Sequence, residues 1–254
     1  MGLDKGLLYL AFGETYDTVA AYSIRYSRKF TDLPICVLTN LNESQRHPLW
    51  KDIDNIQFIE LDIPTDYNRN VKTSLVEYTP FDQTIFVDCD AVIQNPGIET
   101  MFDLLRKHDV MFQYVKIIEG KVLEHPNIIK HYLPTMGRLA FDPPIRIYHS
   151  GLFGFKKNKR TIKLFRWWNR YWKEGTDCGR DMPPLACVLH KFQNEGWIKL
   201  NQFTAEDLWF CEGSCKCPFN PNAIVQHRFR PTKTDNFFKK FSIPKYKTYK
   251  PFDR

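Results

Sequence analysis

Short, mainly apolar runs alternate with stretches of helical periodicity through most of this 254-residue chain. The run at 7–12 is continuously apolar, the runs at 34–39, 56–61 and 84–87 are mainly apolar, and an amphipathic stretch at 16–30 separates the first two. Strands that are apolar on both faces lie buried between helices, as in βαβ units with parallel strands. The sequence therefore predicts an α/β fold with a mostly parallel central sheet and flanking helices.

The remaining regular elements follow from the same periodicities. Further strands are predicted at 110–115, 148–155 and 197–200, and further helices at 72–78, 99–107, 161–172 and 184–195. Beyond residue 201 the periodicity weakens and prolines recur in a lysine-rich ending, which favours an extended tail. No repeat, Gly/Ser linker or change of composition divides the chain. We expect one domain over residues 1–254, of which 234–254 form a basic C-terminal tail.

Charge and cysteine content bear on the environment and the ligand. The 36 Lys and Arg residues exceed the 29 Asp and Glu residues by +7, which favours an anionic ligand. No stretch approaches the roughly 20 consecutive apolar residues of a membrane helix, so no membrane span is predicted. Acidic residues near the N-terminus differ from a secretory signal. Seven cysteines, several of them inside apolar runs, fit the reducing cytoplasm, where we expect the protein to act.

Asp88 and Asp90 directly follow the apolar run 84–87. Ligands of parallel sheets collect at the carboxyl ends of strands, and residues two apart can face one crevice. Two adjacent carboxylates favour Mg²⁺ or Mn²⁺, and His227 at the end of the apolar run 223–227 would favour Mn²⁺ as a third ligand. Alone, however, Asp pairs are common in solvated turns, and a single histidine after a strand is usually structural.

Several segments, in chain order, resemble the GT-A class of nucleotide-sugar glycosyltransferases, in particular its glycogenin and galactosyltransferase-like branch. The similar segments are the first strand and nucleotide loop at 9–16, the basic helix residue Lys72, the Asp-x-Asp strand at 85–93, the Asn-Ser-Gly strand at 149–155, the Asp-Gln segment at 180–182, and the closing pair His227 and Lys233. This chain departs from the family pattern at His149, Met182, Arg230 and Thr234. The resemblance covers about residues 7 to 233.

The resemblance implies a GT-A (Rossmann-like) fold and metal-dependent transfer of a hexose from a UDP-sugar to an acceptor hydroxyl on a glycan or glycoside, with retention of configuration. It implies Mn²⁺ or Mg²⁺ as the cofactor, with Asp88, Asp90 and His227 as its ligands. The residues implied to bind the nucleotide sugar are Ala11, Phe12, Gly13, Tyr16, Lys72, Asp88, Ser150, Gly151 and Lys233. Asp181 and Lys72 are the implied catalytic residues.

Each of these assignments has a structural alternative. Asp181 could orient the donor sugar or accept a proton from the acceptor hydroxyl, but it could also be the N-cap of the helix that follows. Phe12 and Tyr16 could face the base or pack in the core. Lys72 could neutralise phosphate charge or be a solvated helix residue, and Ser150 with Gly151 could admit the sugar or fit a tight crossing of strands.

Other functions remain open on the sequence. The basic aromatic stretch 156–173 and the basic tail favour a polyanionic acceptor, such as hydroxymethylated pyrimidine in viral DNA. A catalytically silent sugar-nucleotide-binding module is a further alternative, because fold does not fix activity. A nucleotidyltransferase is disfavoured, since no glycine-rich phosphate loop follows the first strand. Cys211, Cys215 and Cys217 offer a zinc hypothesis, although their spacing differs from usual zinc knuckles. No oligomeric state is predicted.

Overall fold

The computed structural model describes residues 3–119, 126, 128–175, 179–207, 210–211 and 220–227. Its central sheet has seven strands in the order β3-β2-β1-β4-β7-β6-β8. The strands are β1 (Leu3–Ala11), β2 (Ile35–Thr39), β3 (Ile56–Glu60), β4 (Phe81–Val87), β6 (Val110–Ile118), β7 (Ile145–Lys156) and β8 (Leu200–Phe203). Only β7 runs antiparallel to its neighbours. The mostly parallel α/β sheet predicted from the apolar runs is confirmed.

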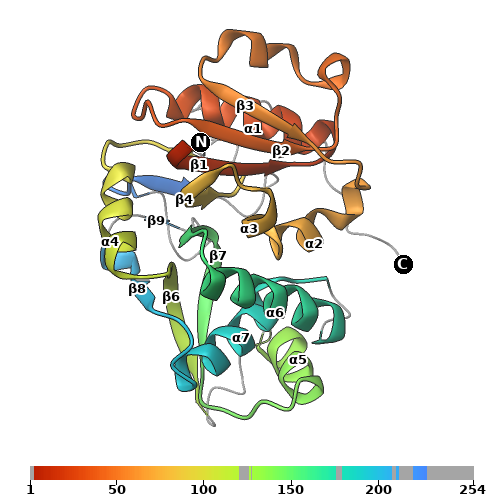
Figure 1. Cartoon of the computed structure of the whole chain (residues 1–254), viewed down its shortest axis with the longest axis vertical. Coiled ribbons are helices and arrows are strands. Elements are labelled where there is room, and N and C mark those ends of the chain that lie inside the picture. The colour runs from red at the N-terminus through yellow and green to blue at the C-terminus, as the bar shows by residue number, and fades with distance from the viewer. Residues whose placement is uncertain are drawn as a thin grey trace.

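Helices cover both faces of this sheet (Figure 1). The helix α1 (Gly13–Ser27) and the helix α4 (Met101–Lys107) pack on one face, against alternate residues of β1, β2 and β4. The other face carries α2 (Asn68–Lys72), α3 (Leu75–Tyr78), α5 (Leu133–Arg138), α6 (Lys159–Gly175) and α7 (Met182–Asn194). Two layers of helices therefore bury both faces of the central strands, which explains why the sequence of these strands is apolar throughout.

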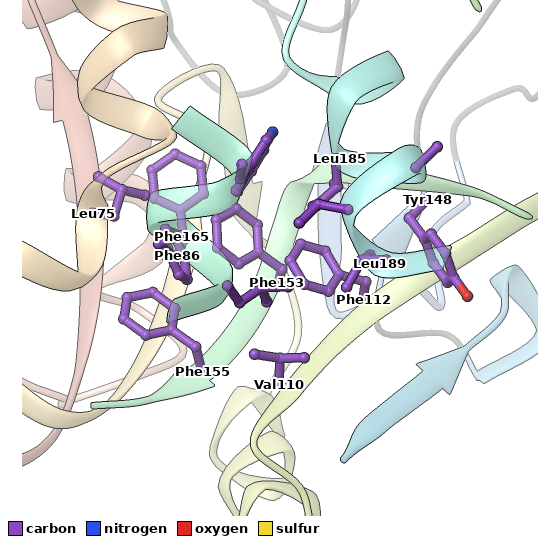
Figure 2. Packing of buried hydrophobic residues seen from close by; sticks show 14 of the residues in the cluster. Leu75, Phe86, Val110, Phe112, Tyr148, Phe153, Phe155, Phe165, Leu185 and Leu189 are labelled. Atoms are coloured by element: carbon purple, nitrogen blue, oxygen red, sulfur yellow. The ribbon is translucent and has the colours of Figure 1, made fainter. Parts of the chain in front are cut away.

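The larger core contains a row of aromatic rings between the sheet and the helices α6 and α7 (Figure 2). Phe112 of β6 and Phe153 of β7 stack with ring centroids 4.8 Å apart, and Phe86 of β4 lies 4.9 Å from Phe153. Phe165 and Trp168 of α6 pack over the same rings. Such aromatic pairs contribute beyond the area that they bury, and here they hold β4, β7 and α6 in a fixed relation.

A second, smaller sheet lies beside the end of β4. It has the order β5-β10-β9, formed by β5 (Ala91–Ile93), β9 (Phe210–Cys211) and β10 (Val225–His227). The sequence analysis did not predict β5 or β9. Side-chain amides help to join its distant segments, because Gln94 and Asn95 donate hydrogen bonds to the carbonyl of Ala223 at 2.9 and 2.7 Å. The small sheet thereby brings residue 227 next to residue 91.

Short 3₁₀ segments and one π-helical turn complete the described chain. They are Glu43–Gln45, Pro48–Asp52, Thr65–Tyr67, Ile98–Thr100 and Ala205–Asp207, with the π turn at Ile128–Tyr132. The π turn and α5 were not predicted from the sequence. Within the part of the chain described, no helix combines the length and the apolar character needed to cross a membrane.

Two predicted elements differ in the structure. The helix expected at 72–78 is instead two short helices, α2 and α3, because the Thr73 hydroxyl bonds the carbonyl of Asn70 at 2.8 Å and competes with the helical pattern. The strand expected at 197–200 begins only at Leu200. Trp197 instead belongs to the turn that caps the C-terminus of α7: its N–H bonds the Phe192 carbonyl, and Gly196 before it has a positive φ of 67°.

Part of what the sequence predicts falls outside the described residues. This applies to Lys233, to the tail at 234–254, and to Cys215 and Cys217 of the zinc hypothesis. For Cys211 the backbone is described as the end of β9, but the side chain is not.

Candidate active site

The two acidic residues that follow β4 form the centre of the candidate site. The strand β4 is buried up to Val87, and the backbone N–H of Asp88 then bonds the carbonyl of Gly151 on β7 at 2.9 Å. A turn follows, in which the N–H of Ala91 bonds the Asp88 carbonyl at 2.9 Å. The side chains of Asp88 and Asp90 remain 24% and 32% exposed. Their carboxylates are thus fixed at a strand end with access to solvent.

His227 joins these carboxylates from the far end of the sequence. The antiparallel pairing of β10 with β5 places His227 opposite Ala91. Its Nε2 atom lies 3.0 Å from Asp90 Oδ1 and 3.6 Å from Asp88 Oδ2, while the imidazole is buried. Burial by itself would lower the pKa of His227, but the two carboxylates, Asp90 foremost, raise it. The three residues expected to meet do lie together.

The donor set of this cluster suits a divalent cation. One ligand atom from each of Asp88, Asp90 and His227 lies within 4.8 Å of the others. Carboxylate oxygens are the preferred donors for Mg²⁺ and Mn²⁺, and an imidazole nitrogen is a good donor for Mn²⁺. The partial exposure of both carboxylates leaves the cluster accessible from one side. The residues present therefore fit a metal with open coordination positions.

Lys72, at the end of α2, connects this cluster to a second acidic group. Its Nζ atom lies 2.7 Å from Asp88 Oδ1 and 3.4 Å from Asp181 Oδ2, and 5.0 Å from the centroid of the Phe86 ring. Burial would lower the pKa of Lys72, but the carboxylates of Asp181 and Asp88 outweigh burial and raise it. Lys72 is therefore a buried cation shared by two carboxylates rather than a solvated helix residue.

Asp181 precedes α7, but its carboxylate makes no hydrogen bond to the helix N-terminus. The Ser150 hydroxyl instead donates to Asp181 Oδ2 at 2.7 Å, and the indole N–H of Trp168 donates to the Asp181 carbonyl at 2.9 Å. Burial would raise the pKa of Asp181, but Lys72, the Ser150 hydrogen bond and Arg69 lower it to about 2. The capping alternative thus does not describe the side chain, which is a firmly ionised carboxylate facing Lys72.

Ser150 and Gly151 lie where β7 bulges away from β6. Phe112 pairs with Phe153, yet the next residue of β6, Gln113, pairs with His149, so three residues of β7 have no partner position on β6. Bulges of this kind redirect side chains and recur near functional sites. Here the bulge turns Ser150 toward Asp181 and the carbonyl of Gly151 toward Asp88.

His149, a departure from the resembled pattern, also lies within the site. Its Nδ1 atom accepts a hydrogen bond from the Gly151 N–H at 2.9 Å, and its ring packs edge-on against His227 with centroids 5.3 Å apart. Burial, reinforced by His227 and Lys72, holds the pKa of His149 well below its usual value. A neutral His149 therefore supports both the bulge and the His227 ring.

The predicted nucleotide loop begins at the end of β1, which lies next to β4 in the sheet. Ala11 and Phe12 are fully buried, and the Phe12 ring packs in the larger core, as its core-packing alternative had it. Gly13 has a positive φ of 76°, and its N–H bonds Asn40 Oδ1 at 2.8 Å. Tyr16 is partly buried against the other core. Among the residues predicted here, the backbone at 11–13 and the partly buried Tyr16 side chain are the groups that could face a ligand.

Several supporting residues were missed by the sequence analysis. Asn40 holds Gly13 and also donates to Thr65 Oγ1 at 3.0 Å. Arg69, one turn before Lys72 on α2, donates to the Gly179 carbonyl at 3.1 Å, while Asn169 of α6 donates to Asn70 Oδ1 at 2.6 Å. The spacing of Arg69 from Lys72 is a signal that could have been used. Nothing in the sequence around Asn40 or Asn169 indicates their contacts.

The predicted site residues therefore fall into two groups. Hydrogen bonds and ion pairs connect Lys72, Asp88, Asp90, Ser150, Gly151, Asp181 and His227 into one cluster. Ala11, Phe12, Gly13 and Tyr16 lie at the carboxyl end of β1, the same edge of the sheet from which Asp88 projects. The remaining residue, Lys233, is outside the described residues.

Comparison with known proteins places this arrangement in a recognised fold. No protein-family model matches the chain, and no curated protein matches its sequence. A structure of the galactosyltransferase LgtC in complex with donor and acceptor sugar analogs is similar with a TM-score of 0.62 and 13% identity, over 93% of this chain and 94% of that one. A structure of an active-site mutant of LgtC gives a TM-score of 0.64 at the same identity and coverage.

A third similar structure is that of WbbM, a bifunctional glycosyltransferase. It has a TM-score of 0.63 and 13% identity, and it covers 95% of this chain but 49% of WbbM. The structural neighbours of this chain are thus glycosyltransferases, and the order of its strands is that of an α/β sheet with helices on both faces. The chain has the GT-A fold of these glycosyltransferases.

Proposed function

We propose that this protein is a metal-dependent glycosyltransferase that moves a hexose from a UDP-sugar to an acceptor hydroxyl, with retention of configuration. The observation that carries the proposal is the convergence of Asp88, Asp90 and His227 within 4.8 Å, directly beside the Lys72 ammonium group. A sugar nucleotide brings a diphosphate, and these residues offer both a cation site and a fixed positive charge for it. The glycosyltransferase fold of the neighbours supports the same assignment.

Each part of the donor has residues suited to it. Asp88, Asp90 and His227 would hold Mn²⁺ or Mg²⁺, which supplies Lewis-acid neutralisation of the diphosphate charge when bound. Lys72 contributes a second positive charge at the same phosphates, and Asp88 can also contact the ribose. The backbone at Ala11–Gly13 and the Tyr16 ring line the nucleotide side, because β1 ends beside β4. Lys233 is proposed to reach the diphosphate from the closing segment.

Asp181 is better suited to orient the donor sugar than to accept a proton. The transfer breaks the bond from the sugar anomeric carbon to the phosphate oxygen, which keeps the electron pair. The acceptor oxygen bonds that carbon, and its proton passes to the released phosphate oxygen. A general base works best when its pKa lies near the working pH. A pKa of about 2 leaves Asp181 a weak base, while its hydrogen bond from Ser150 fixes its direction. Ser150 and Gly151 are small enough to admit the sugar.

The acceptor is proposed to be a glycan or a glycoside, with DNA carrying hydroxymethylated pyrimidine as the rival acceptor. The alternative of a catalytically silent module differs in that it would bind the sugar nucleotide without breaking it. We propose a cytoplasmic location, as the cysteine usage indicates.

Thermal denaturation of the full chain with a panel of nucleotide diphosphate sugars tests the donor. The panel should include UDP, GDP and dTDP sugars, each with and without Mn²⁺. We expect UDP-hexoses with Mn²⁺ to give the largest rise in melting temperature, because a ligand of the native state stabilises it. The variant Asp90→Asn should lose the Mn²⁺-dependent part of this rise. A panel in which no sugar nucleotide shifts the melting temperature would overturn the proposal.

Slow release of free sugar from the best donor, without any acceptor, tests the reaction itself. We expect release that needs Mn²⁺ and that is lost in Asp90→Asn. Proton NMR of the released sugar at early times gives the anomeric configuration, and retention is the expected result. Binding without any release, whichever acceptors are added, would favour the silent module.

A further inference from the structure

The helix α6 presents a row of cations to solvent. Five basic residues recur at spacings of four, three, four and three, which on a helix places them on one face; they are Lys159, Lys163, Arg166, Arg170 and Lys173. All five are exposed, and we refer to them as the α6 basic face. At 1.5 Å per residue the face is about 21 Å long. The apolar residues of α6 point the opposite way, into the larger core.

Most of this charge is not neutralised by neighbours. Arg170 pairs with Glu174 at 2.8 Å, and Arg166 lies 3.7 Å from Glu77 of α3. Among the residues that the structure describes, no ion pair involves Lys159, Lys163 or Lys173, although Lys163 also lies over the Trp197 ring at 3.3 Å. Within the described residues, the α6 basic face therefore carries three ammonium groups without an acidic partner.

This arrangement is unfavourable for the helix by itself. Like charges at i,i+3 and i,i+4 destabilise a helix by about 0.2–0.5 kcal/mol a pair, and the face contains four such neighbouring pairs. The first turn of α6 contains Lys159 and Arg160 but no acidic residue, which opposes the helix dipole. A solvated surface helix usually mixes both signs. A row of positive charges that destabilises its own helix therefore points to an anionic partner whose binding compensates for this repulsion.

The chemistry of the face selects one kind of polyanion. Single-stranded nucleic acid binds to exposed aromatic platforms, and membranes take inserted apolar side chains. The exposed large apolar residues in the described part of the chain are Tyr67, Val115 and Ile129, none of which is on α6. The α6 tryptophans Trp167 and Trp172 are partly buried, and Arg170 lies over the Trp167 ring, so neither offers an open platform for a base. A straight row of cations of this kind suits regularly spaced phosphates that are contacted without reading bases.

The position of α6 leaves the face accessible. In Figure 1 this helix crosses the front of the lower half of the molecule, below α2 and α3. Its C-terminal part reaches the candidate site, since the indole N–H of Trp172 donates to the Gly179 carbonyl at 3.3 Å, two residues before Asp181. We infer that the α6 basic face binds the phosphate backbone of double-stranded nucleic acid, independently of base sequence. The inference does not depend on sugar transfer.

Fluorescence anisotropy with a labelled duplex DNA of random sequence, about 20 base pairs long, tests it on the full chain. Phosphate contacts from all five cations predict an affinity that falls by about 500-fold between roughly 50 and 200 mM NaCl. The triple variant Lys159→Gln, Lys163→Gln, Lys173→Gln should weaken binding at least tenfold. It should also reduce the slope of log affinity against log NaCl concentration by about 3, since each phosphate contact contributes about 1 to that slope. The corresponding triple Lys→Arg variant keeps the charge and should bind like the wild type.

A matched variant separates this face from the overall positive charge of the chain. The matched triple variant is Lys29→Gln, Lys51→Gln, Lys107→Gln, which removes the same charge from exposed lysines that lie outside α6, near α1 and on α4. This variant should change the affinity for DNA less than threefold. Equal losses in the two Gln variants, or no loss in the α6 variant, would overturn the inference. So would α6-dependent binding to anionic vesicles or to a polyuronate but not to duplex DNA. Melting curves of all variants verify folding.

Discussion

Lys72 is the cation that two acidic groups of the site, Asp88 and Asp181, share. Its ammonium group lies within 3.4 Å of carboxylate oxygens from both Asp88 and Asp181, and all three side chains are largely buried. Buried charges are costly unless they are paired. The pairing explains how two elements far apart in sequence, β4 and the start of α7, can present carboxylates to one place before any ligand binds.

Replacing Lys72 by Ala should therefore cost stability as well as activity. The change leaves two buried carboxylates without their cation, and breaking a buried pair on one side costs about 3–5 kcal/mol. We expect the free energy of unfolding, measured with urea, to fall by about 3 kcal/mol. The control Lys107→Ala, at the exposed end of α4, should leave it within about 0.5 kcal/mol of wild type. Equal stability of the two variants would show that Lys72 is not the buried counter-ion.

Asp181 gives a pH dependence whose direction can be worked out. Its pKa in the folded protein is about 2, below the value of about 3.9 for an unfolded chain. A carboxyl group with a lowered folded pKa stabilises the protein above the unfolded pKa, and this contribution is lost as the pH falls toward the folded pKa. The stability difference between wild type and Asp181→Asn should thus shrink by about 2–3 kcal/mol from pH 5 to about pH 2. Urea titrations at intervals of pH measure it, and a constant difference would contradict the assigned pKa.

At the scale of elements, the end of β1 depends on one glycine. Gly13 has a φ of 76°, and a Cβ atom on it would lie 2.9 Å from Thr65 Cγ2. Gly13→Ala should therefore lower the free energy of unfolding by about 1–3 kcal/mol and weaken nucleotide binding. Gly137→Ala in α5 meets nothing within 4 Å and should be neutral or stabilise the protein by up to about 1 kcal/mol. If both substitutions behave alike in urea unfolding, the loop does not need the glycine conformation.

The elements themselves could be predicted wherever burial left a continuous apolar run. The strands β1, β2 and β4 follow from such runs, since helices cover both of their faces, whereas β3 is the half-buried edge strand and its run is only mainly apolar. The break between α2 and α3 could not be predicted, because it depends on the Thr73 hydroxyl competing for a backbone carbonyl. The three-residue strands β5 and β10 are too short to show a period, and their pairing comes from contacts such as Gln94 with Ala223.

In the candidate site, too, some residues could be predicted from the sequence and others could not. Asp88 and Asp90 are visible in the sequence because they end an apolar strand, whereas the approach of His227 depends on the small sheet that pairs β10 with β5. The direction of Ser150 depends on the bulge in β7, which arises from packing against β6 and has no local sequence signal. Asn40 and Asn169 act only through contacts with distant segments. Residue types could thus be predicted, but their convergence needed the fold.

At the scale of the whole molecule, the site joins the helix layer on the face of the larger core to the small sheet. Lys72 comes from α2 and Asp181 from the start of α7, on the face of the larger core. His227 comes from the small sheet and Asp90 from the turn that leads into it, and the small-sheet residues Ala91, Ile93 and Val225 pack in the other core. A ligand that contacts all four residues therefore connects parts of the chain that otherwise meet mainly through the central sheet.

Binding of Mn²⁺ with UDP should accordingly stabilise the molecule as one unit. A ligand at about 100 times its dissociation constant adds about 2.7 kcal/mol to the native state. We expect the melting transitions followed by circular dichroism and by tryptophan fluorescence to rise together, because the tryptophans of α6 lie on the Asp181 side while the proposed metal ligands include the small sheet. His227→Ala should lose this rise, whereas His108→Ala at the end of α4 should keep it. A rise seen by one probe alone would mean that the ligand bridges fewer elements than the geometry of the four residues implies.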